Sequence, residues 1–449
     1  MKSLRGTLLT AATLLFSCFA MAQSAVDAAR ILDLETGFGA RALGMGGAYL
    51  GVGDDYSAAY WNPAGLALMK RSEFYLEFSH LRFTNDVTYQ TELTSSSTNA
   101  TKFNAIGLVL PVPTVQGSLV FSLGYQKVKD FDYINQFRGI SDADNGLSLP
   151  VDTTGQLYDF FGEDVQRGES ITDEGGMNQY NLSGAIDISP NISFGMALNY
   201  WAGKSEYRLE FSQDDVQNNF TDFPADFDRY LETRSITADY SSFNAVLSGM
   251  YRLGRLARLG VTYATPMKFN INETYFQNSS LAFDNGDSFE FEPVEGQFEY
   301  DVQIPFEVGT GAAVYLGPIL ASGSVRYRDW SQMKFKSPDA FKSENSEIRS
   351  TYGETLRWNI GGEFSLPLFD AKLRAGYMKI PNPLKDAAPE TDREFYTLGA
   401  GILLDRYLRV DFAAMLGKWQ RESNDDLAPE VSAEDIFYRK FLLTFSYRF

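Results

Sequence analysis

The sequence predicts an all-β membrane protein, an antiparallel transmembrane β-barrel of about fourteen strands with an N-terminal plug inside its lumen. Three observations predict this fold. Apolar and polar residues alternate with a period of two along many segments, and the connections between these segments alternate between long and short. A compact, glycine-rich segment precedes the first of them. A lipid-facing barrel wall needs one apolar and one polar face on every strand.

The first 22 residues have the three parts of a secretory signal peptide. Lys2 and Arg5 supply positive charge, Leu8 to Ala20 is mostly apolar, and Ala20-Met21-Ala22 offers small residues at a cleavage site. We therefore expect a cleaved signal peptide over residues 1–22, in preference to a buried N-terminal helix. The single cysteine, Cys18, precedes that site, so the mature chain is expected to lack disulfides and thiolate chemistry.

Residues 23–71 form the expected plug. Ala25 to Leu34 is expected as a short helix, and seven glycines between Gly37 and Gly53 allow tight turns and close packing. Pro63 restricts Asn62 to extended or turn geometry. The alternative, a flexible periplasmic tail, fits poorly with the aromatic and apolar residues of this segment, which are Phe38, Leu43, Met45, Tyr49, Trp61, Leu66 and Leu68.

The barrel is predicted over residues 72–449. Its last strand is the clearest, because Phe441, Leu443 and Phe445 share one face while Thr444 and Ser446 share the other. The expected strands are 72–84, 102–111, 117–128, 178–188, 192–204, 236–251, 256–274, 297–316, 318–334, 354–365, 369–379, 393–404, 407–420 and 437–449.

The connections indicate which end of the barrel faces outward. Asn85 to Thr101 and Lys129 to Met177 are long, whereas Pro111 to Gln116 and Gly317-Pro318 are short. Long loops outside and short turns on the periplasmic side are typical of outer-membrane barrels, and a soluble sandwich has no reason for this asymmetry. The C-terminal Phe449 resembles the signal read by the barrel-assembly machinery, an expected partner during biogenesis. The mature barrel is expected as a monomer among outer-membrane lipid and lipopolysaccharide of a diderm bacterium.

Composition excludes several classes of function. The net charge of −19 disfavours nucleic acid as a partner, because phosphates bind basic surfaces. Beyond the signal peptide no run of about 18 apolar residues could form a transmembrane helix. The only histidine, His80, stands without a metal-ligating or catalytic neighbour in the sequence. We therefore expect no enzyme activity, no catalytic residues, no metal site and no cofactor.

The plug segment carries a family resemblance. Arg41-Ala42-Leu43-Gly44-Met45-Gly46-Gly47-Ala48, Asp54-Asp55 and Asn62-Pro63-Ala64-Gly65-Leu66 together resemble the plug of the FadL/TodX family of outer-membrane long-chain fatty-acid and hydrocarbon transporters. Ile304-Pro305 with Tyr327 to Gln332, and Gly376 to Gly401, are similar to later stretches of that family. The plug motif also resembles PorV-like barrels, so an accessory barrel of a protein secretion system is an alternative function. A purely structural barrel or adhesin is the third.

The resemblance implies passive transport of a small hydrophobic ligand (a long-chain fatty acid, an alkane or an aromatic hydrocarbon) through a plugged barrel, with lateral exit into the membrane. It assigns the plug motif to Gly44, Met45, Gly46, Gly47, Asp54, Asp55, Asn62, Pro63 and Ala64. Candidate ligand-path residues in the plug, whose alternative role is packing against the wall, are Phe38, Leu43, Met45 and Tyr49.

Two further sets of candidates lie in the barrel strands. Basic residues that could bind an anionic head group, or pair instead with lumen carboxylates such as Asp411 or Glu363, are Arg326, Arg328, Lys334, Lys372 and Arg374. Gly117 and Gly124 are candidates for a gap in the wall, because glycine inside a strand can mark a bend. Family members break the wall at the third strand, but glycine is also ordinary in barrel strands.

Overall fold

A computed structural model describes residues 35–149, 156–367 and 370–449. The expected signal peptide at 1–22 and the expected helix from Ala25 to Leu34 lie outside these ranges. None of the helices in the described ranges is long and apolar enough to cross a membrane.

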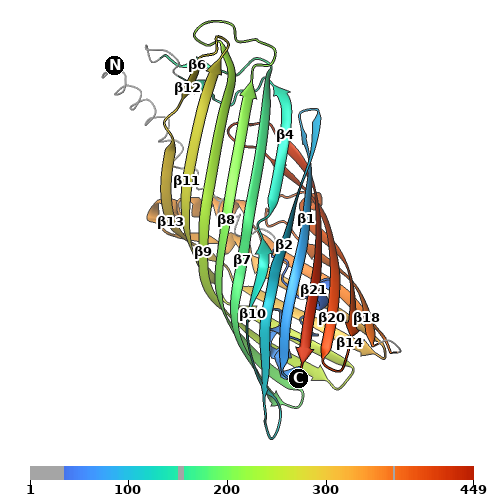
Figure 1. Cartoon of the computed structure of the whole chain (residues 1–449). Helices are drawn as coiled ribbons and strands as arrows, with labels where there is room; N and C mark the ends of the chain where they lie inside the picture. The colour runs from blue at the N-terminus through green and yellow to red at the C-terminus, as the bar shows by residue number, and fades with distance from the viewer. Residues whose placement is uncertain (1–34, 150–155, 368–369) are drawn as a thin grey trace.

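The wall is a closed antiparallel β-barrel (Figure 1). β1 (Glu73–Tyr89) pairs with β2 (Glu92–Val112) on one side and with the last strand, β21 (Ser432–Arg448), on the other, which closes the barrel. Fourteen strands span the wall, so the predicted fold class is confirmed. Several elements are consecutive pieces of one spanning strand, such as β3 with β4 and β10 with β11.

The remaining strands of this sheet are β3 (Leu119–Asp130), β4 (Tyr133–Ser141), β7 (Val165–Ser189), β8 (Ile192–Asp214), β9 (Phe227–Leu253), β10 (Ala257–Ala264), β11 (Met267–Phe283), β12 (Ser288–Glu290), β13 (Val294–Ile304), β14 (Glu307–Leu316), β15 (Ile319–Asp329), β16 (Lys334–Ser337), β17 (Glu354–Leu366), β18 (Ala371–Ile380), β19 (Arg393–Leu403) and β20 (Leu408–Ser423). β5 (Ser148–Leu149) and β6 (Tyr158–Asp159) form a separate small sheet above the barrel (Figure 1).

An apolar belt surrounds the lower part of the barrel. On β7, Tyr180, Leu182 and Ile186 are 46–57% exposed, as side chains that face lipid should be. Aromatic rings mark the outer edge of this belt, with centroids 5.4 Å apart between Tyr125 and Tyr180 and 6.2 Å apart between Tyr180 and Tyr200. Such girdles lie at the level of the lipid head groups.

The wall rises far above the belt on one side (Figure 1). β7, β8 and β9 contain 25, 23 and 27 residues, whereas a tilted transmembrane strand needs about 9–11. Above Tyr200 the outward residues of β8 become charged, starting with Lys204 and Glu206. The upper half of this wall therefore stands in water, outside the membrane.

The expectation that Asn85 to Thr101 forms a loop is wrong. β1 and β2 stay paired through this stretch up to Tyr89 and Glu92, and Gln90 takes a positive φ of 54° in the tight turn. Lys129 to Met177, also expected as a loop, contains β4 and the first half of β7. Above the membrane both faces of a strand meet water or the polar lumen, so no apolar stripe reveals the strand in the sequence.

Short helices occupy the outer connections on the side of the barrel where the wall strands are shorter. η2 (Trp330–Gln332), η3 (Asp339–Lys342) and α5 (Glu344–Thr351) lie between β15 and β17, and η4 (Pro389–Thr391) lies between β18 and β19. Ile348 of α5 is fully buried in a cluster with Tyr300 and Phe335. These segments therefore pack over the lumen instead of extending into solvent.

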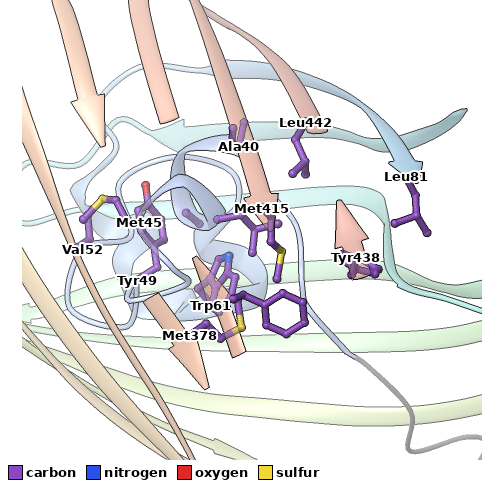
Figure 2. Packing of buried hydrophobic residues seen from close by; sticks show 14 of the residues in the cluster. Ala40, Met45, Tyr49, Val52, Trp61, Leu81, Met378, Met415, Tyr438 and Leu442 are labelled. Carbon is purple, nitrogen blue, oxygen red and sulfur yellow. The ribbon is translucent and has the colours of Figure 1, made fainter. Parts of the chain in front are cut away.

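The N-terminal segment from Glu35 to Met69 fills the lower lumen. It contains α3 (Ala40–Gly44), α4 (Ala58–Trp61) and η1 (Pro63–Leu68), and it is buried along almost its whole length. Figure 2 shows Met45, Tyr49 and Trp61 of this segment packed beside Met378 and Met415 of the wall. The main hydrophobic core of the molecule is therefore the contact between the plug and the inner face of the barrel.

Candidate functional site

A buried ionic cluster fastens the plug to the wall. Glu363 of β17 accepts hydrogen bonds from Arg41 Nε at 2.9 Å and from Arg374 Nε at 2.8 Å, and it also binds Lys372. Arg374 Nη1 lies 2.8 Å from Asp411. The side chains of Glu363 and Arg374 are 3% and 0% exposed, so these charges are stable only as a paired group.

The plug motif supplies the opposite end of this cluster. Arg41 also pairs with Asp54, and Asp55 accepts a hydrogen bond from the Tyr49 hydroxyl at 2.7 Å. Burial by itself would raise the pKa of the Asp54 carboxyl, but the guanidinium groups of Arg41 and Arg258 outweigh burial and hold that pKa well below its usual range. Asp54 is therefore ionised at neutral pH and neutralises Arg41.

Glycines allow the plug backbone to touch the wall. A Cβ added to Gly376 would lie 2.3 Å from the Gly46 nitrogen, and one added to Gly361 would lie 2.1 Å from the Met45 oxygen. Gly46 itself has a φ of +63°, a conformation that residues with a Cβ rarely adopt. The Gly-Met-Gly-Gly part of the motif therefore fits a glycine-lined area on β17 and β18.

Asn62 closes a turn inside the plug. Its Oδ1 accepts a hydrogen bond from the Ala64 nitrogen at 3.1 Å, and its Nδ2 donates one to the Leu50 carbonyl at 2.7 Å. The side chain is fully buried. Asn62 caps η1, as expected for a residue that Pro63 holds extended.

We expect Asn62→Ala to destabilise the plug by about 1–3 kcal/mol, because the buried Leu50 carbonyl loses its 2.7 Å donor and the Ala64 nitrogen keeps only Ser248 as an acceptor. Limited proteolysis of purified barrels should detect the change as faster cleavage between Gly37 and Leu68. The control is Asn99→Ala, because the Asn99 side chain is exposed. Asn359→Ala is unsuitable as a control, because Asn359 is buried like Asn62. Equal cleavage rates for all three proteins would contradict this role.

A cavity of about 90 Å³ lies above the plug, at the level of the outer end of the belt. Its apolar lining includes Met177, Trp201, Phe269, Ile304 and Ile380. Ligand pockets usually measure about 300–1,000 Å³. This cavity is therefore too small to enclose a whole ligand of that size.

Basic side chains outnumber acidic ones around this cavity. Five cations line it against two carboxylates, which are Glu35 and Glu307, so the described lining has an excess of three positive charges. Glu307 lies 3.3 Å from Arg326 and 3.0 Å from Arg328. The cations are Lys129, Arg326, Arg328, Arg357 and Arg393.

Unlike Arg326 and Arg328, which pair with Glu307, Arg357 has no ion pair to another described residue. Its Nη1 donates to the Glu35 carbonyl at 2.8 Å and its Nη2 to the Met378 sulfur at 2.8 Å, while its buried Nε has no partner. Sequence reasoning missed Arg357. The alternation on the expected strand 354–365 places it on the lumen face with Asn359, but it does not show which lumen cation lacks a carboxylate.

The basic candidates from the sequence fall into three groups. Arg326 and Arg328 line the cavity, and they also stack on Trp61 and Trp330 at 4.9 and 4.7 Å from the ring centroids. Lys372 and Arg374 belong to the plug cluster around Glu363. Lys334 is exposed between the buried Met333 and Phe335, so it points away from the lumen.

The ligand-path candidates of the plug pack against other side chains. Phe38, Leu43, Met45 and Tyr49 are fully buried in the two clusters that join plug and wall. None of the four is part of the cavity lining. Their position therefore corresponds to the alternative role given to them from the sequence, which is packing against the wall.

The two wall-gap candidates do not interrupt the wall. Gly117 takes a φ of +77° before β3 begins, and Gly124 is paired with Gly107 of β2. Both Gly107 and Gly124 lie against the Tyr56 ring, which would be 2.0–2.3 Å from an added Cβ. Gly124 is therefore needed to accommodate the plug.

The wall is interrupted at a different part of the third strand. The β2–β3 ladder ends at the pair Ala105–Gln126, and beyond it β3 pairs with β7 alone. β4 then lies behind β1, where the Asn85 side chain donates to the Ile134 carbonyl at 3.0 Å. We call the place where β2 has lost its ladder to β3 the seam. It begins beside Tyr125, at the outer edge of the apolar belt.

Comparisons with known proteins agree with this architecture. Residues 167–427 match the family described as outer membrane protein transport protein (OMPP1/FadL/TodX). The P. putida toluene transporter TodX has 13% identity and a TM-score of 0.59, over 93% of this chain and 99% of that chain. A Pseudomonas aeruginosa FadL homologue has 14% identity and a TM-score of 0.59, over 90% and 97%.

The Ralstonia pickettii toluene transporter TbuX has 13% identity and a TM-score of 0.54, over 92% of this chain and 99% of that chain. At such low identity these three likenesses show a shared fold. No curated protein sequence matches the chain.

Proposed function

Since residues 167–427 cover more than half of its 449 residues, this chain belongs to the OMPP1/FadL/TodX family of outer membrane transport proteins, and we propose that it carries amphiphiles with one carboxylate, such as long-chain fatty acids. In this proposal residues 1–22 direct export and are cleaved, 23–71 close the lumen as the plug, and 72–449 form the conducting barrel. Transport is passive, and the chain acts as a monomer without a cofactor.

The charge balance of the cavity carries this proposal. An anionic head group would bring its negative charge to a lining with five cations and two carboxylates. Arg357 has no ion pair to another described residue, and a bidentate carboxylate would satisfy its unpartnered Nε. A neutral alkane or arene would leave that group unsatisfied. The cavity therefore favours a fatty acid over toluene, the ligand of the toluene transporters TodX and TbuX.

The apolar residues provide binding for the tail. Each methylene that leaves water contributes about 0.8 kcal/mol, so a short apolar surface holds an alkyl chain without any bond to it. Phe269 and Trp330 belong to this apolar surface of the cavity. The proposed exit is the seam between β2 and β3, which begins at the outer edge of the apolar belt, so that the tail would leave toward lipid along this edge.

We expect Arg357→Met to weaken the binding of oleate to the purified barrel by about tenfold, because the loss of one charge-assisted hydrogen bond costs roughly 1.5 kcal/mol. Toluene binding should not change. Trp201 and Trp330 line the cavity, so a titration of tryptophan fluorescence reports both ligands. Arg208→Met is the matched control, because Arg208 is exposed on the outer face of β8.

Tight toluene binding with no measurable oleate binding by the unaltered protein would instead indicate a neutral hydrocarbon as the ligand. Equal losses for oleate and toluene in Arg357→Met would indicate a damaged cavity in place of a lost head-group contact. The matched family consists of transport proteins, so no comparison supports the PorV-like alternative.

A further inference from the structure

At the seam, β2 and β3 are not joined by a backbone ladder. Above the pair Ala105–Gln126, β2 pairs with β1 alone, and β3 follows β7 through a bulge between Lys127 and Lys129. Closure of the barrel at this height therefore depends on side chains. Phe103 of β2 stacks on Tyr125 of β3 with ring centroids 5.9 Å apart, and the charged side chain that crosses the seam is Lys102, on β2 just above the end of the ladder.

Lys102 contacts both components on the far side of the seam. Its Nζ donates to the Gly175 carbonyl of β7 at 3.0 Å, and it pairs with Asp132 in the link between β3 and β4. It also lies 3.4 Å from Asp130 at the end of β3. The Lys102 side chain is 20% exposed, whereas those of Asp130 and Asp132 are 3% and 8% exposed.

The two aspartates are held differently. Asp130 is bound on its other side by Lys440 of β21, at 2.7 Å, and both side chains are almost fully buried. That pair fixes the end of β3 to the inner face of the barrel. Among the described residues, Asp132 forms its ion pair with Lys102. Asp132 is therefore the carboxylate that a competing anion can replace without disturbing the Lys440 anchor.

The seam and the cavity are connected through one short piece of chain. Lys129 lines the cavity and stacks on Phe131 at 4.9 Å, and it directly precedes Asp130. A carboxylate that leaves the cavity along this segment reaches Lys102 next. A cation of the cavity lining thus directly precedes the carboxylate that Lys102 approaches at the seam.

From this arrangement we propose that Lys102 is a selective latch on the seam. Its pair with Asp132 keeps β2 against the β3–β4 link, and the carboxylate of a departing ligand opens the seam by replacing Asp132 on the Lys102 ammonium group. The latch therefore passes an anionic amphiphile and hinders a neutral molecule with the same tail. This inference rests on the proposed function and adds the residue that sets selectivity at the exit.

The first test compares two ligands with the same tail, oleate and oleyl alcohol. Cells without their own transporter express the chain, and the uptake of each labelled ligand is measured. The unaltered protein should take up oleate about tenfold faster than the alcohol, since the charge-assisted contact is available to oleate alone. Lys102→Met should bring this ratio close to one by speeding the uptake of the alcohol, and Lys102→Arg should restore it.

The matched control is Lys268→Met, which removes an exposed ion pair with Asp301 on the outer face. It should leave the ratio unchanged. A ratio that stays the same in folded Lys102→Met would overturn the latch. Absence of oleate uptake by the unaltered protein would overturn the proposed function itself, so the two failures are distinguishable.

The second test locks the seam. The only cysteine, Cys18, precedes the expected cleavage site, so the variant Lys102→Cys with Asp132→Cys can be bridged by a short bis-maleimide. Bridging should abolish oleate uptake, while the same variant without the reagent should transport both ligands. The control Asp86→Cys with Ser95→Cys bridges a pair that is already joined across the β1–β2 ladder. Uptake through the bridged Lys102 and Asp132 variant at the control rate would show that ligand does not use the seam.

Discussion

Glu363→Gln should free the plug from a barrel that stays closed. Three cations surround this carboxylate, and Gln cannot neutralise Arg41, Lys372 and Arg374. The removal of one partner from a buried ionic group costs about 3–5 kcal/mol. The barrel itself keeps the β17 ladders to β15 and β18, which Gln does not disturb. The cost therefore falls on the docking of the plug.

Ion conductance in planar bilayers measures this release. The unaltered protein should conduct little, and Glu363→Gln should show large, frequent openings together with trypsin cleavage after Arg41. Heat-modifiable gel mobility checks that the barrel remains folded. The matched control is Glu206→Gln, whose carboxylate is 62% exposed and pairs with Lys204 on the outer face. If the folded Glu363→Gln barrel conducts as little as the unaltered protein and its plug resists trypsin, packing alone holds the plug.

Gly376→Ala should also loosen the plug, in this case through a steric clash. The added Cβ would lie 2.3 Å from both the Gly46 nitrogen and the Met45 carbonyl carbon. These are backbone atoms on the plug, and Gly376 itself is held in the β18 ladders, so neither side can turn away as a flexible side chain would. We expect a cost above the roughly 1–3 kcal/mol that is usual for overpacking in a core.

Gly323→Ala is the control for this substitution. It places the same methyl group in β15, where the nearest atom would be the Asn359 carbonyl oxygen at an ordinary 3.7 Å. Gly376→Ala should lower the temperature at which plug cleavage by trypsin begins, and Gly323→Ala should not. If both variants behave like the unaltered protein, the plug backbone does not touch the wall as closely as the structure shows.

The sequence predicted the part of each strand that faces lipid. Leu182 and Ile186 must be apolar because hydrocarbon surrounds them, and their alternation with Ser183 and Ala185 is visible in the chain. The upper halves of β7, β8 and β9 could not be predicted in this way, because water on the outside removes the demand for an apolar face. Their outward-facing residues, such as Lys204 and Glu206, are charged, and in the sequence such residues are typical of a loop.

The candidate site was predictable only in its chemistry. The lumen arginines Arg326 and Arg328 were found because they alternate with apolar residues on one strand, and the structure places both on the cavity. The sequence could not show that Arg374 joins Glu363, because 11 residues and a turn separate them. The seam escaped prediction for a related reason. It depends on Lys102 meeting Asp132, and neither residue belongs to a local pattern.

The position of the plug sets an order of events during synthesis and folding. The plug is among the first segments to be made, yet its docking partners come from the end of the chain, since the Ala40 nitrogen binds Thr444 and Gly46 binds Thr397. The sequence separations are 404 and 351 residues, a very high contact order that favours slow formation. The same Thr444 belongs to β21, whose ladder to β1 closes the wall. The plug can therefore dock completely only when nearly the whole chain is present, and the strand that receives Ala40 is the one that closes the wall.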